Sequence, residues 1–137
     1  MKKKSPDKKN VPPIFGELSK LCDSLLYISE IDAAVTPFFS PGEFPETFLM
    51  DQRTSSEAKI ETGSIDDFFA KATSEKDWHN AKDKERVEKY RRLKTFMKAN
   101  LRDLSLYRIG RIRIDIYVIG IDAEGNTAGI QTKAVET

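Results

Sequence analysis

The sequence predicts one layered domain in which helices sandwich a sheet of about four strands, an α/β or α+β fold. Three observations support this. Apolar residues recur at helical intervals in three segments, but at every second position between residues 107 and 137. The length of 137 residues suits a single domain, which can bury roughly two-thirds of its unfolded surface.

Charge divides the chain unevenly. There are 23 Lys and Arg residues against 22 Asp and Glu, a formal net charge of +1. Five lysines against Asp7 give residues 1–10 a local +4, so the remainder is near −3. We therefore expect a disordered basic tail at 1–12 and a domain at 13–137. With no membrane-length apolar run, no signal peptide and Cys22 as the single cysteine, we expect a cytoplasmic chain that binds no membrane.

Residues 107–137 predict a β-hairpin. Its first strand has apolar residues at alternate positions: Ile112, Ile114, Ile116 and Val118. Its second strand has the same spacing at Ala128, Ile130, Thr132 and Ala134. Asp122–Asn126 supplies a turn, in which Gly125 or Asn126 can take the positive φ. The hairpin would hold Glu136, Thr137 and the terminal carboxylate at one place, as oxygen ligands for a cation.

The first helix is predicted from Ile14 to about Tyr27–Ser29, with Pro13 in its first turn. Glu30 would then follow the C-terminal end of this helix. The helix dipole disfavours a carboxylate there, so Glu30 requires a role other than helix stabilisation.

Two further helices are predicted in the second half. Ser64 begins the shorter one as its N-cap, with Asp67 at the capping-box position. Thr73 or Ser74 begins a longer helix that ends near Asn100. Its inner stripe is Val87, Tyr90, Leu93, Met97 and Leu101. Short strands are expected near residues 47–50 and 58–61.

The residue inventory argues against an enzyme. His79 is the sole histidine and lies in a charged segment without a serine or cysteine motif. HExxH, CxxC and glycine-rich nucleotide motifs do not occur in the sequence. Cys22 falls on the buried stripe of the first helix. We therefore expect a binding protein with no cofactor and no metal of its own.

Three strings of the sequence resemble the nuclease A inhibitor family. They are LLYISEID after the first helix, then IDDFFAKATSEKDW, then YRIGRIRIDIYVIGIDAEGNTAGIQTKAVET. The resemblance implies a three-layer α/β/α sandwich with a mixed sheet of about four strands, a variation on the pathogenesis-related-1 arrangement. It also implies inhibition of a magnesium-dependent, sugar-non-specific DNA/RNA endonuclease of the ββα-metal type.

The same resemblance assigns two residues to the metal site of that nuclease. The family uses its C-terminal threonine and a glutamate after the first helix, which match Thr137 and Glu30. Magnesium accepts hard oxygen ligands in exchange for water, and a glutamate can replace the scissile phosphate in pairing with basic residues. The metal would belong to the nuclease. Glu136 is a weaker candidate, because adjacent strand residues point to opposite sides.

Trp78 and Asp77 are expected at the rim of the same surface. Tryptophan is enriched in binding hot spots, although one at a helix start often packs under the preceding loop. Lys76 beside them would weaken binding to a basic nuclease cleft.

Two alternatives stay open. Residues 33–62 resemble the family poorly, so the same fold can serve a different, non-nuclease protein partner. The lysine-rich tail, together with Arg108, Arg111 and Arg113, raises the alternative of nucleic-acid binding. Near-neutral charge and the lack of an aromatic stacking platform argue against direct nucleic-acid contact.

Overall fold

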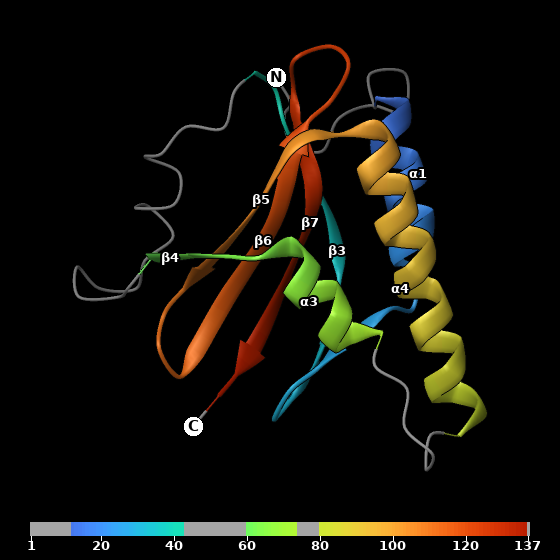
Figure 1. Ribbon diagram of the computed structural model, residues 1–137, viewed down its shortest axis with the longest axis vertical. Coiled ribbons are helices and arrows are strands. Elements are labelled where there is room, and N and C mark those ends of the chain that lie inside the picture. Colours follow the sequence, from blue (N-terminus) through green and yellow to red (C-terminus); the bar gives the residue numbers. More distant parts are fainter. Residues whose placement is uncertain (1–11, 43–59, 74–79, 137) are drawn as a thin grey trace, which may run out of the picture.

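The structure is a computed structural model that describes residues 12–42, 60–73 and 80–136. Within these ranges it has three helices and seven strands (Figure 1). The helices are α1 (Pro13–Cys22), α3 (Ile65–Ala72) and α4 (Ala81–Asn100). The strands are β1 (Leu26–Ile28), β2 (Asp32–Ala34), β3 (Thr36–Ser40), β4 (Ile60–Gly63), β5 (Arg102–Ile109), β6 (Arg113–Ile121) and β7 (Thr127–Val135).

Five strands form one antiparallel sheet in the order β3-β7-β6-β5-β4. β6 lies at its centre and pairs with β7 from Arg113 opposite Val135 to Ile121 opposite Thr127. β3 carries Pro37, which cannot donate to a strand ladder and is therefore tolerated where one edge needs no partner. β1 and β2 form a separate antiparallel hairpin.

All three described helices contribute to one hydrophobic core on one face of the sheet. This core joins α1, α3 and α4 to β5, β6 and β7, and Figure 1 shows α1 and α4 side by side along the sheet. Its members include Leu18, Phe69, Tyr90, Leu93, Met97, Leu106, Ile116, Val118 and Ile130. The opposite face carries a smaller cluster: Phe38, Ile109, Tyr117 and Ile119.

The predicted three-layer α/β/α sandwich, with its mixed sheet of about four strands and pathogenesis-related-1 arrangement, was wrong. The main sheet has five strands, and every pair in it is antiparallel. A second, two-stranded sheet was not predicted. Residues 26–40 caused much of this error. Their strands are only three to five residues long and lack clear alternation, so periodicity could not reveal them.

The first helix ends earlier than predicted, at Cys22 instead of Tyr27–Ser29. Ser24 has φ +58°, a left-handed conformation that terminates a helix. Leu25 is nevertheless 1% exposed and belongs to the core, and its carbonyl oxygen accepts the Val35 N–H at 3.0 Å. An apolar residue at helical spacing was thus buried by tertiary packing outside a helix.

The other helices agree with the sequence in their caps and faces. The Ser64 hydroxyl oxygen accepts the Asp67 N–H at 3.1 Å and begins α3, as predicted. α4 begins later than predicted, after Asn80, which forms a reciprocal capping box with Asp83. The predicted inner stripe is buried: Val87, Tyr90, Leu93, Met97 and Leu101. The strand expected near 58–61 corresponds in part to β4, whereas residues 1–11, 47–50 and 74–79 lie outside the described residues.

The β6–β7 hairpin and its turn confirm the predicted pairing of two strands, but residues 107–109 belong to β5, Ile112 precedes β6, and Thr137 lies outside the described residues. Gly125 has φ +83° and supplies the left-handed position that the turn requires. The Asp122 carboxylate accepts the N–H groups of Glu124 and Asn126, both at 2.9 Å.

Among the described residues, none of the helices is both long and apolar enough to cross a membrane.

Candidate functional site

The tip of the β1–β2 hairpin, residues 29–31, is bonded to the end of β7. The Glu30 N–H donates to the Val135 carbonyl oxygen at 3.3 Å. In return, the Val135 N–H donates to the Ser29 hydroxyl oxygen at 3.0 Å, across 106 positions of sequence. The Ser29 N–H closes the tip itself by donating to the Ile31 carbonyl oxygen at 2.9 Å. Glu30 is therefore held beside the last residues of the sheet.

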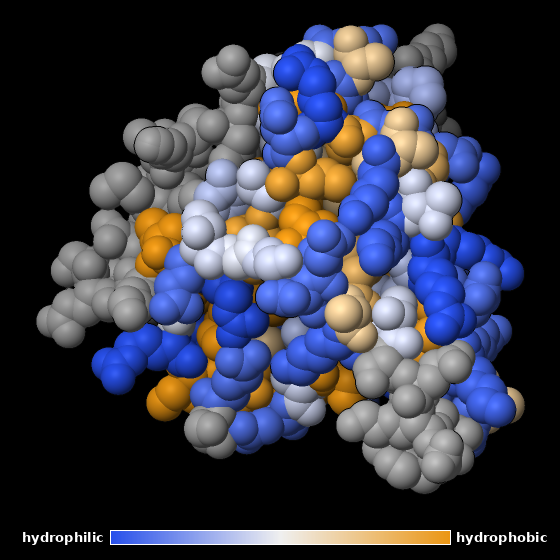
Figure 2. Space-filling view, viewed as in Figure 1, coloured by the Kyte–Doolittle hydropathy of each residue, from blue (hydrophilic) through white to orange (hydrophobic). Residues whose placement is uncertain are grey.

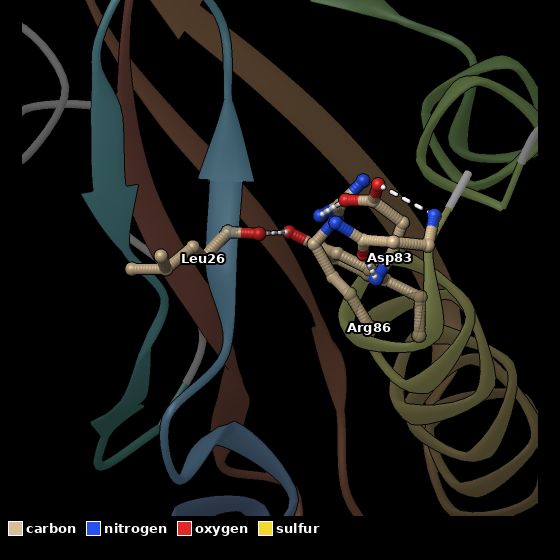
Figure 3. A network of polar contacts seen from close by, with 5 residues as sticks. Leu26, Asp83 and Arg86 are labelled. Atoms are coloured by element: carbon tan, nitrogen blue, oxygen red, sulfur yellow. Dashed lines mark hydrogen bonds and ion pairs between the residues drawn. The ribbon is translucent and has the colours of Figure 1, made fainter. Parts of the chain in front are cut away.

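The β1–β2 hairpin is held from two sides. On one side, the Tyr90 hydroxyl of α4 donates to the Leu26 carbonyl oxygen at 2.8 Å (Figure 3). Burial raises the pKa of Tyr90, which keeps this hydroxyl protonated as a donor. On the other side, the Thr132 hydroxyl of β7 donates to the Ala34 carbonyl oxygen at 3.0 Å. A short two-stranded hairpin is marginal alone, so these contacts fix the position of Glu30.

The start of α4 is itself fixed by a polar network around Asp83. One Asp83 oxygen pairs with Arg86 at 2.8 Å, and the other accepts the Asn80 N–H at 3.3 Å (Figure 3). The Asn80 side chain in turn accepts the Asp83 N–H at 2.9 Å. The helix that holds β1 through Tyr90 therefore begins at a defined residue.

Glu136 already has a charged partner within the chain. Arg108 donates to its carboxylate at 2.6 Å, and the Glu136 N–H donates to the Ile112 carbonyl oxygen at 2.9 Å. The pair lies close to buried Tyr27. Burial raises the pKa of Tyr27, while the charge of Arg108 lowers it and that of Glu136 raises it. Glu136 thus fixes the end of β7 against β5 and against the turn that follows β5.

The structure brings two of the predicted site residues together. Glu30 is exposed at the hairpin tip, and Glu136 directly follows β7, the strand to which that tip is bonded. Thr137, Trp78 and Asp77 lie outside the described residues, as does Lys76. The roles of all five candidates in partner binding stay predictions.

Sequence reasoning missed three residues that shape this region: Ser29, Arg108 and Ile112. Ser29 bridges to Val135 through its hydroxyl, and Arg108 meets Glu136 across strands 28 positions apart in sequence. Neither contact has a local motif. The pairing register of β5, β6 and β7 would have been needed to find them.

The described residues contain no group of three or more His, Cys, Asp or Glu side chains placed to hold a metal ion. Glu30 is one exposed carboxylate, and the Glu136 carboxylate is paired. Such an arrangement can add an oxygen ligand to a cation held by another molecule.

Comparison with known families assigns the chain. The sequence profile of a family described as "Nuclease A inhibitor-like protein" matches residues 12–137. The chain belongs to this family. The match confirms the resemblance and includes residues 33–62, which had looked divergent. No curated protein is similar enough to this nuclease A inhibitor-like chain to count as a match. The family description is that of an inhibitor and points to a nuclease as its partner.

Proposed function

We propose that this chain inhibits a magnesium-dependent, sugar-non-specific DNA/RNA endonuclease of the ββα-metal type by occupying its active site in the cytoplasm. The observation that carries the proposal is the pair of hydrogen bonds between residues 29–30 and Val135. They put an exposed carboxylate and the end of the central hairpin on one surface, in a chain of the nuclease A inhibitor-like family.

The chemistry of the proposed contact is ligand exchange at a metal held by the nuclease. Thr137 supplies a hydroxyl or carboxylate oxygen in place of a metal-bound water. Glu30 pairs with the basic residues that otherwise bind the scissile phosphate. Trp78 and Asp77 contribute at the rim, and Glu136 positions the strand through Arg108. The inhibitor itself needs no cofactor, nucleic acid or membrane for this role.

Rigidity supports tight binding by such a surface. The β1–β2 hairpin is bonded to α4 through Tyr90 and to β7 through Thr132 and Val135. Groups that are ordered before association lose little conformational entropy when the complex forms. The inhibitor therefore presents Glu30 in one geometry.

Titration of a ββα-metal nuclease from the same cell tests this function. We expect the chain to be inactive alone and to abolish nuclease activity with a sharp equivalence point at equimolar inhibitor. Deleting Thr137, or fusing a bulky domain after it, should abolish or greatly weaken inhibition without changing the melting temperature. Glu30→Gln should weaken inhibition less, because the amide keeps the shape but loses the charge.

The outcomes separate nuclease inhibition from binding of a different, non-nuclease protein partner. Full nuclease activity at a large excess of the intact chain would contradict the proposed function and favour a different protein partner. Unchanged inhibition after Thr137 deletion would leave the inhibitor reading intact but remove the terminal ligand. Unchanged inhibition by Glu30→Gln would remove Glu30 from the contact.

A further inference from the structure

Exposed apolar side chains lie on both sides of the end of β7. Among the described residues the exposed large hydrophobics are Leu26 at 39%, Ile28 at 41%, Ile31 at 42% and Ile112 at 57%. The first three belong to the β1–β2 hairpin, which bonds to Val135. Ile112 belongs to the β5–β6 turn, residues 110–112, and its carbonyl accepts the Glu136 N–H. The terminal strand thus runs between two apolar projections.

All these segments lie at one end of the molecule. Figure 1 shows the β1–β2 tip, the β5–β6 turn and the end of β7 together at the lower end of the view. In the same view, Figure 2 shows apolar atoms at that end interspersed with hydrophilic ones. Apolar anchors surrounded by a polar rim occur in protein–protein contacts.

The backbone of the β5–β6 turn is constrained at both ends, although the Ile112 side chain is exposed. Gly110 has φ +115°, and a Cβ there would lie 2.1 Å from the Arg113 carbonyl oxygen, so another residue cannot replace it without moving the turn. The bond from the Glu136 N–H fixes the backbone of Ile112. The turn therefore projects an aliphatic side chain from a fixed backbone, with little entropy to lose on binding.

Ile112 also breaks the pattern that the sequence predicted. It stands in phase with Ile114 and Ile116, which are 4% and 0% exposed, yet β6 begins only at Arg113 and Ile112 points to solvent. A position where the local pattern and burial disagree is expected at a functional site more often than elsewhere.

The two projections carry opposite charge. Exposed Arg111 and Arg113 flank Ile112, whereas exposed Glu30 and Asp32 flank Ile31. The Arg108–Glu136 ion pair lies between them, and its two charges cancel. A partner that meets both projections must therefore offer basic groups to one and acidic groups to the other.

We infer that the β5–β6 turn is a second docking arm for the nuclease, on the side of the terminal strand opposite Glu30. Ile112 fills an apolar depression in the enzyme, and Arg111 and Arg113 face acidic residues around it. The inference rests on the proposed function. The nuclease is the occupant because the Ile112 backbone is bonded to Glu136, so an enzyme surface that receives the terminal strand also meets the turn.

The test measures association and dissociation rates of full-length variants on the immobilised ββα-metal nuclease. Ile112→Ser should dissociate roughly tenfold faster, as expected for loss of an apolar anchor, and Ile112→Leu should restore most of the wild-type rate. Arg111→Glu with Arg113→Glu should slow association roughly tenfold at low salt, with a smaller effect at high salt. The matched control is Arg91→Glu with Arg92→Glu, an equal charge change on exposed positions of α4.

The outcomes distinguish failure of the docking arm from failure of the proposed inhibitor function. If the wild-type chain inhibits the nuclease and Ile112→Ser binds like wild type, the docking arm is wrong and the proposed function stands. Equal rate changes in the α4 control would also overturn the arm, since they would reflect net charge alone. If the wild-type chain does not bind the nuclease, both proposals fail. Unchanged melting temperatures establish that the variants fold.

Discussion

The two ends of the β6–β7 hairpin differ in what their polar groups contact. At the closed end, polar groups of the turn at residues 122–126 bond to one another, because Asp122 accepts two N–H groups of its own turn. Asn126 and Thr127 then bond to Gly42 at 2.8 Å each. At the open end, Val135 and Glu136 bond to the β1–β2 tip and the β5–β6 turn, whose isoleucines are exposed.

We expect this difference to separate stability from partner binding within one hairpin. At the closed end, the bonds of Asp122 are local and hold this aspartate buried at 7% exposure, and the bonds to Gly42 tie the turn to the segment after β3. Bonds at the open end join three segments far apart in sequence, and they orient exposed side chains outward. Changes at the closed end should therefore lower the free energy of unfolding, and changes at the open end should lower affinity.

The largest effect on stability is expected from Asp122→Ala. The substitution leaves the N–H groups of Glu124 and Asn126 without their acceptor in a partly buried turn, and we expect about 1–3 kcal/mol lower free energy of unfolding. Nuclease inhibition by the remaining folded protein should be unchanged. Urea denaturation and the nuclease titration measure the two quantities.

Glu124→Ala is the matched control in the same turn, because the Glu124 side chain is exposed. It should change stability by about 0.5 kcal/mol or less. Equal destabilisation by both variants, or loss of inhibition by folded Asp122→Ala, would contradict the division between the two ends.

Arg108→Ala should have a smaller effect on stability than Asp122→Ala and should act mainly on affinity for the nuclease. The Arg108–Glu136 pair is partly exposed, at 26% and 38% for the two side chains, so its loss should lower stability by about 1 kcal/mol or less. The end of β7 would become less ordered, and inhibition should weaken severalfold. Lys133→Ala removes the cation of the neighbouring Lys133–Asp115 pair and should leave inhibition near wild type. Similar losses in both variants would show that Arg108 has no positioning role.

The fold was predictable wherever alternation or caps were strong. The β6–β7 hairpin, the Ser64 cap and the buried stripe of α4 follow from spacing and local hydrogen bonding. The end of α1 was not predictable, because Leu25 continues the helical spacing while Ser24 turns left-handed. Strand order and direction were also not predictable from the sequence. They depend on which strands pair, and short strands such as β1 and β2 give weak signals.

The candidate site was predictable from the family resemblance, and only in part. The resemblance named Glu30 and Thr137, and the structure adds the reason that Glu30 lies beside β7. It could not show that Arg108 occupies the Glu136 carboxylate, since this contact depends on the register of three strands. Ile112 was predicted in a half-buried strand. The tight turn at Gly110 exposes it instead.

Hydrogen exchange of the inhibitor, with and without the ββα-metal nuclease, tests the central claim most directly. The account predicts slower exchange in the complex for the amides of residues 29–31, 110–113 and 135–136. It predicts unchanged exchange for residues 122–126 at the opposite end of the same hairpin. Protection of the closed turn in the complex, with no change at the three open-end segments, would contradict the account.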